Sequence, residues 1–589
     1  MKKQLHQFIL DALASTYPSE KESIQGLPDF QIESTKDPKH GDYACNVALI
    51  YAKTLRVAPR ELAHKIVAWM QDQDNILAGI DKIDIAGPGF INFTCSLQAR
   101  YQVIQDIFEQ TKAFGKSTVG KGQKILLEYI SSNPTGPLHV GHGRSAAFGS
   151  SLAMLLREAG YHVDCEYYIN DAGRQMEILA VSVWLRYLNF SPFPTNSYQG
   201  DYVKEIANSL QQAFGDEYKV IFSVQDLPLD ENSLDANQSG DKEIYIDAVI
   251  ARAKEVLSPE KFEAIQAFAT KAILSDIKED LSAFGVHFEQ WFSEKSLFTE
   301  GALEKSVIDL KKSGFTEERE GALWFQSTHF GDDKDRVVIR ANGRPTYFAS
   351  DVAYHWNKYH RGYEKLINIF GADHHGYIAR LKAVVSALGK DPDALEILTV
   401  QFAILYRGEE RVSMSTRSGS FVTLRELREE VGNDAARFFY IQRKSDQHMD
   451  FDLELAKSQS NDNPVYYVQY AHARICSVFR QLIEKGDSFN ETLGLDSLSH
   501  LTTDIELNLM KQLSVYPDLI ESAARTCEPH QITHYLRDLA QHFHAYYNSC
   551  IFLVDEAPLR QARLCLIMAT KQVLQNGLSI LGVSAPETM

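Results

Sequence analysis

Two histidines three residues apart, His139 and His142, lie in the stretch 132–142 (SNPTGPLHVGH). If a helix begins there, both face the same side of it. A helix N-terminus presents free N–H groups and a positive dipole end to an anion, and imidazole N–H donors can stabilise charge that develops on a phosphate oxygen. Gly141 lets the backbone approach a flat base or a ribose closely. The stretch therefore indicates a nucleotide-phosphate site, although two histidines can also simply cap a helix.

The segments around this stretch predict a parallel sheet of the Rossmann type. Residues 125–130 form an apolar strand pattern, and residues 162–169 alternate as a second strand. The helix between them has an apolar face, and Gly160 suits its C-terminal end. A strand–helix–strand unit of this kind binds ligands beyond the carboxyl ends of its strands. The histidine stretch occupies that position.

A second group of residues could bind a cation. Tyr347 and Asp351 are four residues apart, so they share one face if residues 346–351 are helical. A carboxylate pairs with a planar guanidinium through two hydrogen bonds, and an aromatic ring can form the wall of such a pocket. A surface aspartate beside a core tyrosine is the plainer interpretation of the same pair.

Two other motifs carry weaker signals. Residues 371–376 (GADHHG) follow a strand and open a helix, but Asp373, His374 and His375 are adjacent on a turn and are poorly placed for one metal ion. No metal site is assigned. Residues 115–121 nearly match a phosphate-binding loop, but a glycine replaces the expected Ser or Thr and a strand follows. We interpret that segment as a linker.

Composition and cysteine spacing limit the classes to which the protein can belong. The chain has 589 residues, a net charge of -18 and seven cysteines without a Cys-x-x-Cys pair. The charge disfavours nonspecific nucleic-acid binding, although a local basic face remains possible. The cysteines predict no structural zinc and a reducing compartment. No signal peptide or membrane-spanning stretch is evident, so a cytoplasmic protein without membrane contact is expected.

The fold class expected is α/β, with three domains. Residues 1–115 form an N-terminal α/β domain with a hairpin around Gly87-Pro88-Gly89. Residues 123–455 form the Rossmann-type catalytic domain, with a polar helical insertion at about 175–320. Residues 456–589 follow a helical pattern to the end. This last segment predicts an all-α bundle.

The motifs together resemble one family. His139-Val140-Gly141-His142 is similar to the HIGH signature of class I aminoacyl-tRNA synthetases, and residues 133–142 resemble the version found in the arginine enzymes. The Tyr347-x-x-x-Asp351 pattern and residues 41–46, 168–175 and 433–439 are similar as well. The resemblance runs over nearly the whole chain.

The resemblance implies roles for these residues. His139 and His142 would stabilise the transition state at the α-phosphate of ATP, with Gly141 and Met414 completing the ATP site. Asn133 would contact the amino end of arginine. Tyr347 and Asp351 would form the pocket for the arginine side chain. Residues 168–175 would line the cleft near the tRNA 3′ end.

The mobile loop of the family departs from its pattern here. The lysines of the usual Lys-Met-Ser-Lys-Ser loop are replaced by Ser413 and Thr416, while Met414 and Ser415 are kept. A compensating lysine found in some arginine enzymes is also missing, because Gly136 occupies its position. Lysine is a point charge suited to phosphate. We therefore hypothesise that Arg417 or Arg411 supplies that charge. Thr423 and Glu426 predict a capping box for a helix over 424–431.

The C-terminal region carries a candidate RNA surface. Tyr466, Tyr470 and Arg474 recur every four residues on one helix face. Tyrosines beside an arginine suit stacking of splayed-out bases, but a tyrosine-rich bundle core would show the same spacing. The resemblance implies anticodon binding here and contact with the tRNA elbow by the first domain.

The activity implied is arginine–tRNA ligation by a monomer. ATP with Mg2+ would enter as a substrate complex, L-arginine and tRNA(Arg) would be the other partners, and no tightly bound cofactor would be needed. In the family, arginine activation requires bound tRNA. The rival interpretations are a class I synthetase for another amino acid, a catalytically silent tRNA-binding paralogue suggested by the missing lysines, and a small-molecule nucleotidyltransferase, which is usually a shorter protein.

Overall fold

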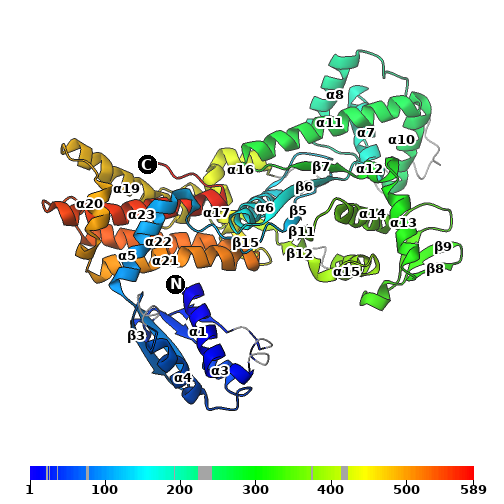
Figure 1. Cartoon of the computed structure of the whole chain (residues 1–589). Helices are drawn as coiled ribbons and strands as arrows, with labels where there is room; N and C mark the ends of the chain where they lie inside the picture. Colours follow the sequence, from blue (N-terminus) through cyan, green and yellow to red (C-terminus); the bar gives the residue numbers. More distant parts are fainter. Residues whose placement is uncertain are drawn as a thin grey trace.

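The computed structural model describes residues 1–589 except 21–23, 25–26, 29, 36, 74–78, 192, 223–241, 373–375 and 413–421. A central parallel sheet lies between a helical bundle and a group of insertion helices, and the N-terminal unit lies beside the bundle (Figure 1). This elongated arrangement separates the carboxyl ends of the central strands from the far end of the bundle. A substrate that reaches both ends must therefore be long.

The N-terminal unit is a four-stranded antiparallel sheet covered by helices. Its strand order is β1-β2-β4-β3, and β3 and β4 form the hairpin predicted from the glycines between them. Alternate residues of β4, such as Ile91 and Phe93, are fully buried, as expected for a sheet with one face on its core. The elements are α1 (Lys2–Thr16), β1 (Ile32–Ser34), β2 (Tyr43–Cys45), α3 (Val47–Tyr51), α4 (Pro59–Gln71), β3 (Ile80–Ala86) and β4 (Phe90–Cys95).

The central sheet is parallel and has the order β12-β11-β5-β6-β7. Strand β5 is buried on both faces, which explains its continuous apolar run. The chain proceeds from β5 to β6 on one side and places β11 on the other, so the strand order reverses beside β5. Ligands bind at such a point. The elements are α5 (Leu97–Gln110), β5 (Lys124–Glu128), α6 (Val140–Glu158), β6 (His162–Ile169), β7 (Gln290–Ser293), β11 (Lys365–Gly371), α15 (Tyr377–Ala387) and β12 (Leu395–Val400).

The stretch expected as an insertion, 175–320, contains both helices outside the sheet and one strand of the sheet. Strand β7 pairs with β6 in parallel, and the stretch then leads into a separate antiparallel sheet of order β10-β9-β8. Residues 336–339 form β10, one edge of this small sheet. The elements are α7 (Arg174–Tyr187), α8 (Asp201–Phe214), α10 (Lys242–Leu257), α11 (Pro259–Ala283), α12 (Glu294–Thr299), α13 (Ala302–Lys312), β8 (Thr316–Arg319), β9 (Ala322–Phe325), β10 (Arg336–Ile339) and α14 (Tyr347–His360).

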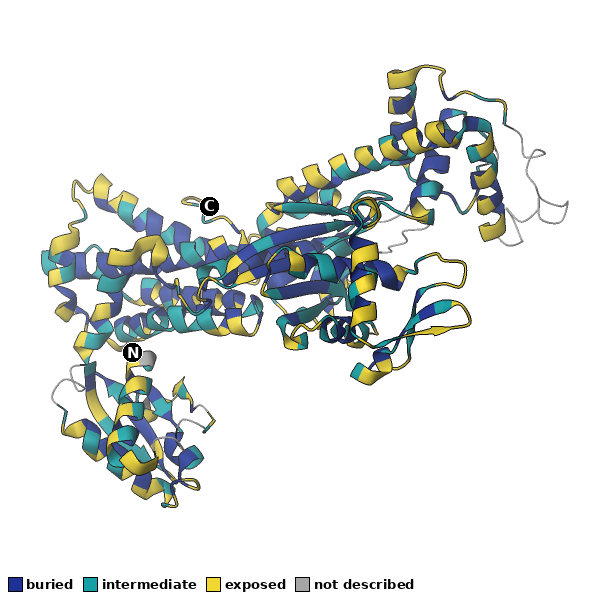
Figure 2. Cartoon of the chain, turned by 45° about the vertical axis from the view of Figure 1, so that its right-hand side comes forward, coloured by how far each residue is buried: buried dark blue, intermediate teal, exposed yellow. Residues whose placement is uncertain are grey.

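The C-terminal part is helical, as the sequence pattern predicts. A small sheet of order β14-β13-β15 precedes the bundle. Figure 2 shows that the inward faces of the bundle helices are buried and their outer faces exposed. The elements are β13 (Ala403–Arg407), β14 (Glu410–Arg411), α16 (Leu424–Val431), α17 (Asn433–Ile441), β15 (Met449–Asp452), α18 (Leu453–Lys457), α19 (Pro464–Glu484), α20 (Glu491–Asp496), α21 (Asp504–Arg525), α22 (His530–Ser549) and α23 (Ala557–Leu581).

Helix α23 is a core helix of this bundle. Among the described residues it alone is long and apolar enough to cross a bilayer, with a mean hydropathy of 1.2 over its most apolar window. Yet 67% of that window is buried inside the protein, and α23 packs on α20, α22 and α19. Its apolar composition is therefore accounted for by packing.

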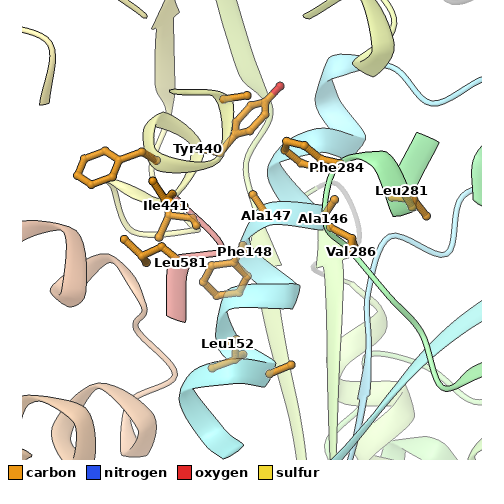
Figure 3. Packing of buried hydrophobic residues seen from close by; sticks show 14 of the residues in the cluster. Ala146, Ala147, Phe148, Leu152, Leu281, Phe284, Val286, Tyr440, Ile441 and Leu581 are labelled. Atoms are coloured by element: carbon orange, nitrogen blue, oxygen red, sulfur yellow. The ribbon is translucent and has the colours of Figure 1, made fainter. Parts of the chain in front are cut away.

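Helix α6 connects the central sheet to the bundle. Its residue Phe148 lies close to Leu581 at the end of α23, and Leu152 follows one turn further along α6 (Figure 3). Arg437 of α17, which is 2% exposed, donates hydrogen bonds to the carbonyls of Leu581 (2.8 Å) and Phe284 (3.0 Å). It also donates to the hydroxyl of Ser150 on α6 (2.8 Å). The helix that begins at the two histidines is thus held rigidly against three other parts of the fold.

Candidate active site

A cavity of about 1010 Å³ opens at the carboxyl ends of β5, β6 and β11. Its walls come from the loop after β5, the start of α6, helix α14 and the segment after β12. Both predicted histidines and Asp351 line it, and so do Asn133 and Gly141. Residues separated by more than two hundred positions therefore meet at the point where the strand order reverses.

The two histidines cap helix α6 and line the cavity at the same time. Nδ1 of His139 accepts a hydrogen bond from the backbone N–H of Gly141 (3.1 Å), and Nδ1 of His142 accepts one from the backbone N–H of His139 (3.3 Å). The rings stack with centroids 3.7 Å apart. Because both Nδ1 atoms are acceptors, the neutral rings carry their proton on Nε2. The capping interpretation and the catalytic one are thus compatible.

Burial keeps both imidazoles neutral. It lowers the pKa of His139. It lowers the pKa of His142 still further, and the neighbouring His139 adds to that effect. A neutral imidazole donates one N–H and does not bring a full positive charge. The pair is therefore suited to hydrogen bonding with an anionic oxygen.

Gly141 has no room for a side chain. A Cβ at this position would lie 2.9 Å from Cε1 of His139 and 3.1 Å from Cδ1 of Phe402. Phe402 follows β12 and is 49% exposed toward the cavity it lines. The absence of a side chain at Gly141 thus lets the rings of His139 and Phe402 pack close to its backbone, and its approach to a base or a ribose stays a prediction.

The segment that follows the predicted mobile loop is bonded to the start of α6. The N–H of Val140 donates to the carbonyl of Val422 (3.2 Å), and the N–H of Leu424 donates to the carbonyl of Leu138 (2.8 Å). The predicted capping box of Thr423 and Glu426 is confirmed, and α16 spans the predicted residues. Ser413, Met414, Ser415, Thr416 and Arg417 lie outside the described residues. Residues 422–424, which follow the loop in the sequence, therefore lie beside the start of α6.

Asn133 is oriented by two polar neighbours. Its Nδ2 donates to Oε1 of Gln175 (2.7 Å), and its Oδ1 accepts from Nδ2 of Asn170 (2.9 Å). Asn170 and Gln175 belong to the stretch 168–175 predicted to line the cleft, and both line the cavity. The side chain is thus held in one orientation before any ligand binds.

Asp351 and Tyr347 are placed differently, although they share one helix face. Asp351 is half-buried and lines the cavity. Burial raises its pKa to about 7; the carboxylates of Glu294 and Glu128 also raise it, whereas Arg380 and Lys358 oppose the shift. Tyr347 is the first residue of α14, is 75% exposed and is not among the lining residues of this cavity. Its assignment to an arginine pocket stays a prediction.

Several lining residues were not singled out from the sequence. Glu128 is the last residue of β5, and a charged residue at the carboxyl end of a buried parallel strand is a usable signal. The insertion also reaches the cleft, because the hydroxyl of Tyr202 donates to the carbonyl of Thr135 (2.8 Å). No local pattern reveals that contact. The unpredicted lining residues include Glu128, Tyr198, Tyr202, Tyr354, His355 and Phe402.

The described part of the chain holds no group of three or more His, Cys, Asp or Glu side chains arranged for a metal ion. Asp373, His374 and His375, which were weighed as metal ligands, lie outside that part. All seven cysteines are free thiols. The described residues that line the cavity offer hydrogen-bond donors, such as Asn133, and carboxylates, such as Glu128 and Asp351.

The predicted RNA surface lies on the bundle, remote from this cavity. Tyr466 and Tyr470 of α19 stack with centroids 5.7 Å apart. The guanidinium of Arg474 lies 4.4 Å from the ring centroid of Tyr470 and 4.7 Å from that of Tyr547. Tyr466, Tyr470 and Arg474 are half-buried. Their rings and the guanidinium pack against one another and against α22, and their contact with RNA stays a prediction.

Three family models match consecutive parts of the chain. The "Arginyl tRNA synthetase N terminal domain" matches residues 3–95, and "tRNA synthetases class I (R), catalytic domain" matches residues 103–190 and 206–472. The "DALR anticodon binding domain" matches residues 468–589.

Curated relatives match over their full length. The arginine–tRNA ligase of Legionella pneumophila (strain Paris) is 55% identical, with 100% of both chains covered. That of Thioalkalivibrio sulfidiphilus is 53% identical, also with 100% of both chains covered. Among solved structures, the Thermus thermophilus arginyl-tRNA synthetase has the same fold, with a TM-score of 0.74 at 22% identity over 100% of both chains. The Plasmodium falciparum arginyl-tRNA synthetase aligns with a TM-score of 0.69 at 18% identity, covering 100% of this chain and 99% of that one.

Proposed function

This chain belongs to the arginyl-tRNA synthetases, a family of class I aminoacyl-tRNA synthetases, and we propose from that premise how its cleft performs arginine–tRNA ligation. The enzyme activates L-arginine with ATP, giving arginyl-adenylate and pyrophosphate. A terminal ribose hydroxyl of tRNA(Arg) then attacks the arginyl carbonyl, forming the ester and releasing AMP. No side chain needs to act as a nucleophile, because positioning and charge stabilisation lower both barriers. ATP enters as its Mg2+ complex.

The meeting of the α6 N-terminus with Asp351 in one cavity is the observation that carries this proposal. We place the α-phosphate of ATP beside the helix end, where Nε2–H of His139 and His142 can donate to its oxygens. Negative charge on those oxygens increases as the arginine carboxylate attacks. Hydrogen bonds aimed at that charge lower the barrier for the chemical step.

The same cavity offers a partner for each charged end of arginine. We assign the guanidinium to Asp351 and the amino end to Asn133, whose carboxamide is held by Asn170 and Gln175. Tyr347 would complete the side-chain pocket. A site built around a carboxylate leaves that charge unpaired when a neutral amino acid enters, which rejects such competitors without an editing step.

Pyrophosphate exchange into ATP with each proteinogenic amino acid, with and without tRNA(Arg), tests the function. Exchange with arginine only, and only in the presence of tRNA, is expected. Exchange driven by another amino acid would contradict the substrate assignment. A protein that binds tRNA yet exchanges with none would be the catalytically silent paralogue.

Loss of two arginines should impair ATP chemistry selectively. We propose that Arg417 or Arg411 replaces the loop lysines by holding the leaving pyrophosphate, and Arg411 lies in β14, at the start of the loop. Replacing both with alanine should lower arginine-dependent exchange by about 10²-fold, as expected for losing a charged contact to phosphate. Filter binding should show tRNA affinity changed by less than about threefold. An unchanged exchange rate would show that neither arginine holds the leaving pyrophosphate.

Removing the ring of Tyr470 should weaken tRNA binding. A stacked base contributes about 1–3 kcal/mol, so Tyr470→Ala should raise the Kd for tRNA(Arg) by about tenfold. Tyr470→Phe keeps the ring and serves as the matched control. If both variants bind tRNA like wild type while Tyr470→Ala unfolds at a lower temperature, the tyrosines belong to the bundle core alone.

We also propose that the enzyme acts as a cytoplasmic monomer without zinc or a resident cofactor, with the three-domain division at 1–115, 123–455 and 456–589. The chain mass is 66.5 kDa. Light scattering on the active enzyme is expected to return this mass, and a multiple of it would contradict the monomer.

A further inference from the structure

A lysine that no solvent reaches lies directly beneath the arginine site. Lys358 of α14 is 0% exposed. Its Nζ lies 2.5 Å from Oε2 of Glu128 and donates to Oδ1 of Asn368 (2.9 Å). The ring centroid of Tyr354 lies 4.1 Å away. Burying an ammonium costs several kcal/mol unless it is paired and hydrogen-bonded, so each of these contacts is needed to keep the charge inside the protein.

Hydrogen bonds run from Lys358 to Asp351 in a single direction. Lysine only donates, so Asn368 turns its Oδ1 toward Lys358 and its Nδ2 toward Nε2 of His355 (3.0 Å). Nε2 is therefore an acceptor, and Nδ1–H of His355 donates to the carbonyl of Asp351 (2.9 Å). Burial, followed by the charge of Lys358, lowers the pKa of His355 to about 3. The His355 ring is thus neutral, as this series of hydrogen bonds requires.

This series of hydrogen bonds joins three elements that surround the cavity. Asn368 of β11 and Glu128 of β5 are direct neighbours across the parallel sheet. Glu128 lines the cavity and accepts a second hydrogen bond from Oγ of Ser131 (3.0 Å). One buried ammonium therefore fixes a carboxylate at the end of β5 and, through Asn368, the turn of α14 that bears Asp351.

Resting on the proposed function, we propose that Lys358 is a positioning residue for arginine. It holds Glu128 in place in the wall of the cavity and, through Asn368 and His355, holds the turn of α14 that bears Asp351. Carboxylates face this region from β5, α12 and α14 (Glu128, Glu294 and Asp351), and the cations near them are Lys358 and Arg380. These carboxylates make the surroundings of Asp351 acidic, which suits the guanidinium of arginine.

The charge on Lys358 should set the pH at which arginine binds. The titratable and charged groups that face Asp351 are Glu128, Tyr168, Glu294, His355, Lys358 and Arg380. Removing the ammonium leaves the carboxylates opposed by Arg380 alone, which favours protonated Asp351. Arginine would then bind only at higher pH. A lysine that merely filled space would not affect this midpoint.

The test is the pH profile of the arginine KM in tRNA-dependent exchange. Lys358→Met should raise the arginine KM at neutral pH by about tenfold or more, shift its pH midpoint upward by about one unit, and change the ATP KM less than about twofold. Lys358→Arg should restore the midpoint. Lys365→Met is the matched control, because Lys365 pairs with Glu396 (2.5 Å) at the opposite end of β11. It should leave both the arginine KM and the midpoint unchanged.

Failure of this inference is distinct from failure of the proposed function. Wild-type exchange with arginine establishes the function first. Equal rises in the arginine and ATP KM with an unmoved midpoint would overturn the positioning role. If Lys358→Met does not fold, Asn368→Ala decides: it keeps the Lys358–Glu128 pair but removes the link to Asp351, so it should raise only the arginine KM. A wild-type arginine KM in that variant would overturn the proposal.

Discussion

Replacing Asp351 with asparagine should raise the arginine KM by about 10²-fold or more while leaving the ATP KM within about twofold. Removing one partner of a desolvated charge pair costs about 2–5 kcal/mol, and the guanidinium of arginine would lose its counter-charge in the cavity. Asparagine keeps the size of the side chain and one acceptor oxygen. The rise in the arginine KM therefore measures the contribution of the negative charge of Asp351.

The arginine KM of the wild-type enzyme should also depend on pH. Burial raises the pKa of Asp351 to about 7, so the carboxyl is largely protonated in mildly acidic solution and cannot pair with a guanidinium. The KM should fall as pH rises through about 7 and reach a plateau near pH 8. Asp351→Asn should abolish this dependence. A midpoint near pH 4, or one that persists in the variant, would show that another group titrates.

Stability provides the control for correct folding. The pKa of Asp351 in the folded protein lies above its unfolded value of 3.8, so the protonated form favours folding. That contribution is present below about pH 4 and is lost as pH rises through about 7. Asparagine cannot ionise, and Asp351→Asn should therefore unfold at a higher temperature than wild type at about pH 8. A lower unfolding temperature would mean that the variant disrupts the site.

Replacing His142 with alanine should lower the kcat of exchange by about 10²–10³-fold, the range measured when one donor to a developing oxyanion is removed. The ATP KM should change little, because the hydrogen bond from Nε2–H strengthens as charge develops in the transition state. His142→Gln carries an amide N–H near the position of Nε2 and should recover part of the loss. If glutamine is no better than alanine, His142 does not act as a donor.

His142 and Asp351 are expected to affect the pH dependence of the reaction differently. Burial lowers the pKa of His142 well below its usual value, so the imidazole stays neutral in the range where Asp351 titrates. At saturating arginine, kcat should be flat from about pH 6 to pH 8.5, while kcat/KM for arginine rises through about pH 7. A kcat that increases in acid would indicate that a protonated imidazole is the active form.

Local features of this protein follow directly from its sequence. The apolar strand β5, the Pro/Gly loop and the helix that begins at the histidines were predictable, because side-chain periodicity and turn residues act over a few positions. The same holds for the β3–β4 hairpin and the capping box of α16. The helical pattern after residue 456 likewise predicted the bundle. Fold class and the histidine motif could therefore be predicted from the sequence.

Tertiary structure decided which chemistry-bearing residues meet. Helical spacing places Tyr347 and Asp351 on one face, but only the fold shows that Asp351 lines the cavity while Tyr347 is 75% exposed. Strand β7 lies within a stretch that otherwise has a helical pattern, and its place in the central sheet depends on pairing with β6. Periodicity identifies a face and not what that face contacts.

The buried network beneath the arginine site had no sequence signal. Lys358 and Glu128 are 230 positions apart, and a lysine in a helical pattern is ordinarily a solvated residue. Only the parallel pairing of β5 with β11, together with the packing of α14, brings them to 2.5 Å and closes water out. The sequence alone determined the local elements and the histidine motif for which phosphate binding is proposed. Long-range packing determined the charges that surround the proposed arginine site, because burial and electrostatic pairing depend on neighbours far away in the chain.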